Sequence, residues 1–299
     1  MKVKDGIIGL TIGDALGVPV EFSTREKLME NPVTGMREGG FHGQPKGTWS
    51  DDTAMTLATM QSIINRKAID YADIMNEFRL FAFKNKYWQD KLFDGGVTTM
   101  DAIYKFDAGV PAVECGGKDE RSNGNGSLMR ILPLAYIPDV TYEQIENVSG
   151  LTHAHMRSKI ACVLYIEIAR SMLSDDLEIA EHIRIACDKI KEHYADSPEL
   201  VNFKRIFEND LDEVSAKGYV ITTFESVVHC LLTTDSFRDA VLKAVNLGRD
   251  TDTVGAICGG LAGIYYGLDE IPEQWIGEVR QIDKIFRLCE KYEKVCLDM

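Results

Sequence analysis

The sequence lacks paired cysteines, long apolar runs and basic stretches, and each lack excludes a class of protein. Its seven cysteines are odd in number and scattered, with no C-x-x-C pair, which argues against a disulfide scaffold or a zinc ribbon. No apolar run approaches the roughly 18 residues that suggest a membrane span. No clear cleavage site follows the short apolar stretch near the start. We therefore expect reduced thiols, a cytoplasmic location and no membrane association.

Positive charge is also scarce. Asp and Glu number 47 against 33 Lys and Arg, so the net charge is −14, and no basic run of five or more compensates for it. This balance argues against a nucleic-acid or anionic-membrane surface. An acidic enzyme that handles a phosphorylated substrate needs local positive charge, and bound metal ions are one source.

Strand patterns are rare, and helical periodicity dominates the chain. Only Tyr219 to Thr223 alternates in a way that suggests a strand, and there is no internal repeat and no Ser/Pro linker. We expect an all-α fold in a single compact multi-helix domain over residues 1–299, with the main loop at 22–49. The predicted helical stretches are 52–66, 71–84, 97–107, 127–137, 155–173, 177–193, 237–247 and 273–296.

Glycines recur every four residues in two expected helices, one near each end of the chain. They are Gly9, Gly13, Gly17, Gly255, Gly259, Gly263 and Gly267. Each costs up to about 1 kcal/mol in a helix interior. A close approach of the two helices, which brings their ends together, would compensate for this cost. Tight core packing remains an equally good explanation of the whole pattern.

Two segments place a pair of carboxylates and several hydroxyls directly before an apolar helical run. They are Ser50-Asp51-Asp52-Thr53 and Asp250-Thr251-Asp252-Thr253. Helix capping explains one such cluster, but a cap needs a single acceptor and each segment offers about four. If the two helix ends converge, four carboxylates crowd together, which is costly unless a cation neutralises them. Their oxygens suit Mg²⁺, Ca²⁺ or Mn²⁺ rather than zinc.

Four further segments contain possible functional groups. Pro19 stops a helix and leaves Glu21 in a loop, although an exposed glutamate is the plainer interpretation. A Gly- and Asn-rich turn at 122–127 and a similar Gly turn at 93–99 offer backbone N–H donors for phosphate, although such turns are common. The segment Thr152-His153-Ala154-His155 lacks an H-E-x-x-H pattern, which argues against zinc.

The order of these motifs resembles the ADP-ribosylglycohydrolase family. The motifs are G-D-A-L-G…E, W-S-D-D-T-A-M, F-D-G-G-V-T-T, N-G-N-G-S-L-M-R, T-H-A-H and G-R-D-T-D-T-V-G. The likeness runs from about residue 5 to 267, and the ordered pair S-D-D-T-A-M and D-T-D-T-V-G is highly specific. The family includes the dinitrogenase reductase-activating glycohydrolase and the ADP-ribosylarginine and ADP-ribosylserine hydrolases. The resemblance implies an all-α fold and two Mg²⁺ or Mn²⁺ ions.

The resemblance also implies roles for individual residues. The implied metal ligands are Ser50, Asp51, Asp52, Asp250, Asp252 and Thr253. The implied catalytic residues are Glu21, Asp51 and Asp94. The residues implied to bind the substrate are Gly95, Gly96, Ser122, Asn123, Gly124, Asn125, Gly126, Ser127 and His153, with Asn125 and Gly126 foremost and His155 a weaker candidate. Nitrogenase-regulating relatives often carry Asn where this chain has Val97, which leaves substrate details near Asp94 open.

The implied activity is removal of ADP-ribose from a modified side chain, by attack of a metal-activated water at the anomeric carbon. Asp94 is suited to hold a guanidinium through paired hydrogen bonds, so an arginine linkage is the first choice. The alternatives are an O-linked serine or small-molecule ADP-ribosyl substrate, a non-catalytic ADP-ribose-binding protein, and a helical scaffold with acidic caps. Expected partners are an ADP-ribosylated protein or small molecule and the product ADP-ribose, with no nucleic acid. The sequence sets no oligomeric state.

Overall fold

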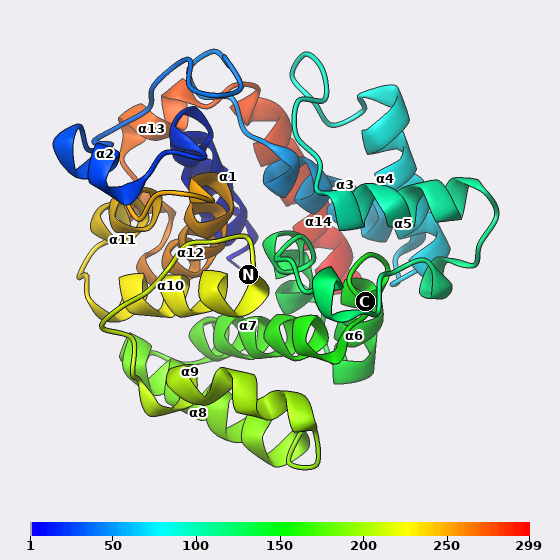
Figure 1. Cartoon of the computed structure of the whole chain (residues 1–299). Coiled ribbons are helices and arrows are strands. Elements are labelled where there is room, and N and C mark those ends of the chain that lie inside the picture. The colour runs from blue at the N-terminus through cyan, green and yellow to red at the C-terminus, as the bar shows by residue number, and fades with distance from the viewer. Residues whose placement is uncertain (1) are drawn as a thin grey trace.

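Helices follow one another along residues 2–299, the part of the chain that this computed structural model describes (Figure 1). No strand forms in those residues, and only three isolated β-bridges occur. The α-helices are α1 Val3–Gly17, α2 Arg25–Glu30, α3 Asp51–Arg66, α4 Tyr71–Lys84, α5 Val97–Asp107, α6 Tyr142–Gly150, α7 Met156–Ser174, α8 Ile179–His193, α9 Lys204–Glu208, α10 Val220–Leu232, α11 Phe237–Val245, α12 Thr251–Tyr266, α13 Glu273–Glu278 and α14 Ile282–Asp298. Short 3₁₀ turns join them, at Val18–Val20, Ala112–Glu114, Glu120–Ser122, Leu128–Arg130, Leu132–Tyr136, Pro198–Phe203 and Leu268–Glu270. The predicted all-α fold is confirmed.

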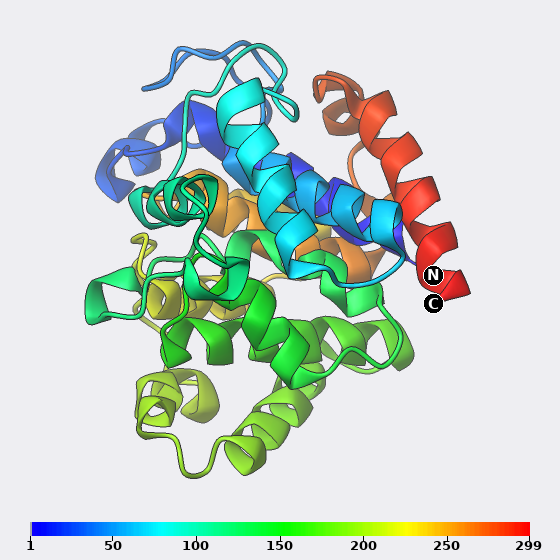
Figure 2. The same ribbon diagram turned by 90° about the vertical axis from the view of Figure 1, so that its right-hand side faces the viewer.

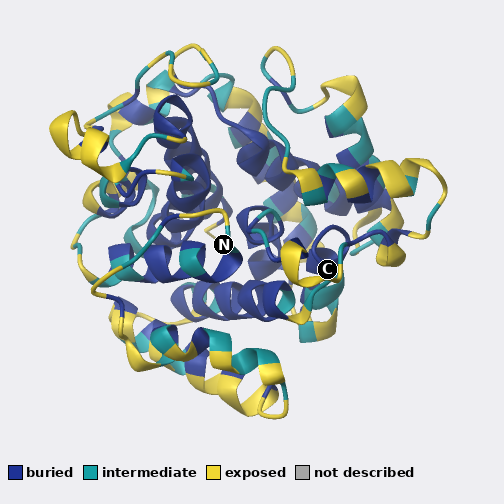
Figure 3. Ribbon diagram, viewed as in Figure 1, coloured by how far each residue is buried: buried dark blue, intermediate teal, exposed yellow. Residues whose placement is uncertain are grey.

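The antiparallel pair α1 and α12 lies at the centre of the molecule, buried over nearly its whole length (Figure 3). A Cβ placed on Gly13 would lie 1.9 Å from the backbone oxygen of Gly255, and one on Gly9 would lie 2.3 Å from that of Gly259. Only glycine permits such backbone contact, so the predicted close approach is confirmed. Gly267 takes no part, because it ends α12 at a φ of +90° with no neighbour within 4 Å.

The other helices wrap this central pair. Helix α14 packs against α1 and α3 along one side of the molecule, while α8 and α9 lie at the end away from it (Figure 2). Helix α7 packs on α8 and α12, and α10 and α11 cover another face of α12. Among the described residues, no helix is both long and apolar enough to cross a bilayer.

Several predicted elements differ from the observed ones. Tyr219 to Thr223 is not a strand: Tyr219 is the N-cap of α10, since five alternating residues cannot be told from the start of an amphipathic helix. The stretch 127–137 forms two 3₁₀ turns instead of one helix, because Pro133 lacks the N–H that an α-helix needs. The stretch 273–296 is split by Gln281, whose φ is +59°. The loop 22–49 contains α2.

Candidate active site

The C-terminal end of α1 and the N-terminal ends of α3 and α12 meet at one point. The antiparallel pairing sets Gly17 of α1 against the backbone of Asp252 in α12. Asp14, in the last turn of α1, anchors α3. Its carboxylate accepts from the backbone N–H of Ser50 at 2.8 Å and from both the N–H and the hydroxyl of Thr53, at 3.0 and 2.6 Å. The two predicted acidic clusters therefore face each other, although they lie some 200 positions apart in the chain.

Two groups of carboxylates form where the helix ends meet. Asp14, Asp52 and Asp252 make up one group, and Glu21, Asp250 and Asp252 the other, with ligand atoms within 4.8 Å of one another in each. Asp252 belongs to both. Asp14, Glu21, Asp52 and Asp252 are buried and Asp250 is partly buried, so water screens their mutual repulsion poorly.

Burial and crowding raise the pKa of each of these acids. Burial, opposed by hydrogen bonds from Thr53 and Ser50, raises the pKa of Asp14 to about 6. Burial and then the nearby carboxylates of Asp94 and Asp250 raise the pKa of Glu21 to about 9. The pKa values of Asp51, Asp52 and Asp252 rise well above the ordinary range for the same two reasons. A bound cation would reverse these shifts by favouring the ionised forms.

The donor set suits a divalent metal. Asp52 Oδ1 and Asp252 Oδ2 are buried and have no hydrogen-bond partner in residues 2–299, which is costly for a carboxylate oxygen unless it binds a cation. The other oxygen of Asp52 accepts from the hydroxyls of Ser50 and Thr253, at 3.0 and 3.4 Å. Carboxylate and hydroxyl oxygens are hard ligands of the kind that Mg²⁺ and Mn²⁺ take.

A pocket of about 500 Å³ opens beside the carboxylates. Its lining combines acids from the helix ends with small residues from two turns and a few larger side chains. The lining residues are Glu21, Phe22, Asp51, Asp94, Gly96, Val97, Thr98, Thr99, Gly124, Asn125, Gly126, Met129, His153, Lys217, Gly218, Arg249, Asp250 and Thr253. The acids thus sit at the side of a cavity large enough for a small organic ligand.

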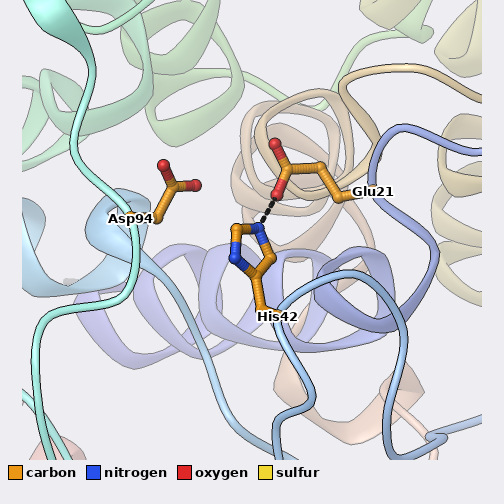
Figure 4. Close-up of side chains that lie close together, drawn as sticks. All are labelled: Glu21, His42 and Asp94. Carbon is orange, nitrogen blue, oxygen red and sulfur yellow. Dashed lines mark hydrogen bonds and ion pairs between the residues drawn. The ribbon is translucent and has the colours of Figure 1, made fainter.

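His42 lies between Glu21 and Asp94, two residues that line the pocket, and its Nε2 contacts the Glu21 carboxyl (Figure 4). Burial lowers the pKa of His42 while Asp94 opposes that shift, and burial also raises the pKa of Glu21, so burial favours the neutral form of both groups. Phe41 packs edge-on against both Phe22 and His42. The loop between α2 and α3 therefore folds back onto Glu21 through His42 and onto Phe22 through Phe41.

The predicted substrate-binding segments reach the pocket only in part. Gly124, Asn125 and Gly126 line it, and Asn125 Nδ2 donates to Asp250 at 2.7 Å, which joins this turn to the acidic cluster. Gly96 and Asp94 also line it. Gly95, Ser122, Asn123 and Ser127 lie outside the lining. All four have hydrogen bonds within the protein instead. The Ser122 hydroxyl donates to Asp119 and the Gly95 N–H to Asp94, while Asn123 accepts from the Ser158 hydroxyl and Ser127 from that of Ser149.

The two histidines of the segment 152–155 have different environments. His153 lines the pocket and is 3% exposed, and its Nδ1 lies 2.8 Å from the hydroxyl of Thr152. His155 is the N-cap of α7, where its Nδ1 accepts from the backbone N–H of Arg157. A capping role accounts for His155 without any ligand.

Sequence reasoning missed two residues at the centre of the site. Asp14 carried a usable signal, because it is an acid within the glycine-spaced apolar run of a helix and was assigned no role. His42 carried none, because nothing in the surrounding loop sequence indicates that it folds back onto Glu21. Lys217, Gly218 and Arg249 also line the pocket and were not predicted.

Comparison with known proteins identifies close likenesses over nearly the whole chain. A family model described as ADP-ribosylglycohydrolase matches residues 1–298. The "ADP-ribosylarginine hydrolase Tri1" of Serratia proteamaculans is 30% identical over 97% of this chain and 78% of its own length. The "ADP-ribosyl-[dinitrogen reductase] glycohydrolase" of Rhodospirillum rubrum is 29% identical over 96% of each chain. A solved structure described as an "ADP-ribosylglycohydrolase-related protein complex" superposes with a TM-score of 0.84 at 26% identity, covering 99% of this chain and 98% of its own.

Proposed function

The chain belongs to the ADP-ribosylglycohydrolase family, and on that premise we propose that it hydrolyses the bond between ADP-ribose and an arginine side chain of a modified protein, with two Mg²⁺ or Mn²⁺ ions. The observation that carries the proposal is the pair of buried carboxylate oxygens without partners, on Asp52 and Asp252, beside a pocket of about 500 Å³. Acids arranged only as helix caps would have no reason to leave such oxygens unsatisfied.

The proposed metal ligands come from both acidic clusters and are Ser50, Asp51, Asp52, Asp250, Asp252 and Thr253. When bound, the ions supply positive charge to the substrate and lower the pKa of a water. Asp14 is not in the predicted ligand set, but its carboxylate groups with those of Asp52 and Asp252, and its hydrogen bonds fix the start of α3. Asn125 holds Asp250 in place through its hydrogen bond.

The residues around the pocket then have separate tasks. Glu21 orients the attacking water and accepts its proton, once the charge of the neighbouring carboxylates is neutralised and its pKa falls from about 9. The turn Gly124 to Gly126 offers a wall without side-chain bulk at its two glycines, where a sugar or phosphate can approach the backbone. The ring of His153 completes that wall.

The preference for arginine rests on Asp94. This carboxylate lines the pocket near Glu21, with His42 between them (Figure 4). A carboxylate suits a guanidinium, because the two groups pair through two parallel hydrogen bonds. A serine-linked substrate offers no such cation. The names of the relatives from Serratia proteamaculans and Rhodospirillum rubrum support a protein-bound substrate.

The test is release of free ADP-ribose from arginine-linked and serine-linked peptides, with Mg²⁺ or Mn²⁺ and with EDTA. We expect metal-dependent release from the arginine peptide, loss of release in Asp252→Ala, and a larger loss on the arginine than on the serine peptide in Asp94→Ala. The matched control is Asp239→Asn, an exposed acid in the first turn of α11 that should leave release unchanged.

Each failure points to a different alternative. Release from the serine peptide alone would replace the proposed linkage. Binding of ADP-ribose without release from either peptide would indicate a small-molecule substrate or a non-catalytic binding protein. Activity that survives in Asp252→Ala would contradict the assigned metal site.

The cysteines bear on the proposed compartment. All seven are buried free thiols, and none is paired in a disulfide. Such thiols persist in a reducing environment, so we propose the cytoplasm.

A further inference from the structure

Arg130 is a fully buried cation with no carboxylate partner among residues 2–299. It ends the motif N-G-N-G-S-L-M-R, and its side chain is 0% exposed. Its Nη2 donates to the backbone oxygen of Val148 at 3.2 Å and to the hydroxyl of Thr152 at 2.9 Å, and its guanidinium lies 4.5 Å from the ring centre of Phe78. Its Nε and Nη1 have no partner among the described residues. Burying a guanidinium without a carboxylate partner costs free energy, so we ask what its hydrogen bonds do for neighbouring residues.

The hydroxyl of Thr152 links Arg130 to His153, because it contacts both side chains. An arginine only donates, so the oxygen of Thr152 is the acceptor of that bond, and the hydroxyl proton is left to donate elsewhere. In residues 2–299 its one available acceptor is Nδ1 of His153, at 2.8 Å. The hydroxyl therefore donates to Nδ1, which must be unprotonated. In a neutral imidazole the ring proton then resides on Nε2.

The backbone holds the His153 ring in place. The N–H of His153 donates to Ser149 at 3.0 Å, and Gly117 bonds the residues on either side of it, with its N–H to Thr152 at 2.9 Å and its oxygen to Ala154 at 2.7 Å. The Nε2 edge faces the glycine turn of the pocket, since Cβ atoms on Gly124 and Gly126 would lie only 3.4 and 3.3 Å from Nε2. With no side chains there, the Nε2–H is free to meet a ligand.

We infer that Arg130 and Thr152 are positioning residues, which fix His153 as a neutral imidazole whose Nε2–H donates to an oxygen of the bound nucleotide, on a phosphate or the ribose. The identity of that ligand rests on the proposed function, while the direction of the hydrogen bonds does not. A ring nitrogen that carries a proton has no lone pair for a metal, so His153 stays a donor beside a site rich in metal ligands.

The electrostatic surroundings agree with this arrangement. Burial, and then the nearby positive charge of Arg130, lower the pKa of His153 to about 3. The guanidinium itself keeps its proton at neutral pH, since burial lowers its pKa only to about 10. The chain of donors therefore runs in one direction over the physiological range, from Arg130 through Thr152 to His153.

The test uses the full-length protein labelled with ¹⁵N in its six histidines, with the His153 signals assigned by their loss in His153→Gln. Long-range ¹H–¹⁵N correlation spectra report which ring nitrogen carries the proton. Calorimetric titration with ADP-ribose reports affinity. We expect the Nε2–H tautomer alone from pH 6 to 8 in the wild type. Thr152→Val, which removes the hydroxyl but keeps the shape, should mix the tautomers and raise the Kd for ADP-ribose about tenfold, the effect of one misdirected hydrogen bond.

Thr152→Ser keeps the hydroxyl and should restore both the tautomer and the Kd. Thr59→Val is the control for a buried hydroxyl lost elsewhere, because that hydroxyl bonds only within α3, to Met55. An Nδ1–H tautomer or an imidazolium in the wild type at pH 7 overturns the inference, even if Thr152→Val does not fold. A Thr152→Val variant that folds and keeps both the tautomer and the Kd of the wild type also overturns the inference. A wild type with the expected tautomer that binds no ADP-ribose would contradict the proposed ligand and leave the donor chain standing.

Discussion

Asp52 and Asp252 each have one buried oxygen to which no donor in the described part of the chain (2–299) is bonded, and other acids lie close to both residues. In the metal-free protein these carboxylates repel one another, and burial disfavours their ionised forms. The oxygens that should destabilise the metal-free fold are the same ones that would bind the proposed divalent ion. Stability and metal affinity therefore oppose each other at these two residues.

Asp52→Asn should separate the two effects. The amide removes one charge from the cluster and donates a hydrogen bond to a neighbouring carboxylate, so we expect the free energy of unfolding of the metal-free protein to rise by about 1 kcal/mol. The same change should abolish the rise in Tm that Mg²⁺ or Mn²⁺ gives the wild type. Urea unfolding in EDTA and thermal melts with metal measure the two quantities. A variant less stable than the wild type in EDTA would contradict the crowding of charge described for this site.

His153 gives a second prediction at the residue scale, on pH. Its pKa is lowered to about 3 in the folded protein by burial and Arg130, against about 6.5 in an unfolded chain. The stability that neutral His153 contributes is therefore complete above pH 6.5 and is lost as the pH falls toward 3. Between pH 7.5 and 5 the wild type should lose about 2 kcal/mol more than His153→Gln. Parallel losses in urea unfolding at the two pH values would show that His153 is not held neutral.

Among the elements, the pair α1 and α12 fixes the geometry of the site. Their glycines let the backbones touch, and that contact sets how far Glu21, just after α1, lies from Asp250 and Asp252 at the start of α12. Backbone contact resists adjustment more than side-chain packing does, since there is no rotamer to change. The two helices therefore hold the acids at fixed positions relative to one another.

Gly13→Ala should therefore be severely destabilising. The added Cβ would lie 1.9 Å from the oxygen of Gly255, and the two backbones would have to separate. We expect a loss of about 3 kcal/mol or more in the free energy of unfolding, measured by urea denaturation, together with weaker metal binding. Gly277→Ala is the control, because it lies in α13 with nothing within 4 Å of the new Cβ. That change should be neutral or stabilising by up to about 1 kcal/mol. Equal effects of the two changes would argue against backbone contact as the limiting factor.

The sequence predicted those elements whose boundaries depend on local signals. The helix expected at 71–84 matches α4 residue for residue, because Asp70 caps its start with a hydrogen bond to the N–H of Asp73 and Asn85 ends it in the left-handed conformation. The division between α13 and α14 was missed, since the apolar spacing continues across Gln281. A backbone turn imposed by tertiary packing leaves no periodic signal.

The sequence predicted most acids of the candidate site and part of the pocket lining, but neither Asp14 nor His42. The two carboxylate-rich helix starts at 50–53 and 250–253 indicated a cluster of acids, and the order of the motifs indicated one family. The contact of His42 with Glu21 depends on how a loop of some 20 residues folds back, which spacing does not encode. The chain from Arg130 to His153 likewise exists only once α6 and the turn after it are packed.

For the molecule as a whole, metal binding should dominate stability. A ligand that binds only the folded state at 100 times its Kd adds about 2.7 kcal/mol to the free energy of unfolding. We expect Mg²⁺ or Mn²⁺ to raise Tm accordingly and EDTA to remove the gain. NaCl at matched ionic strength should not substitute, because the acids are buried and weakly screened. A Tm that responds equally to NaCl and MgCl₂ would favour a helical scaffold with acidic caps.

The contact between Asp52 and Thr253 joins positions 201 residues apart, and Asp252 meets Gly17 across an even longer interval. During synthesis the ribosome releases the first acidic cluster long before the second. At about 5 to 20 residues per second, roughly 10 to 40 s separate the two. Until α12 emerges, α1 has no partner for its glycine face, and its apolar surface stays available to chaperones. The nascent chain can therefore assemble the proposed metal site only after α12 has emerged.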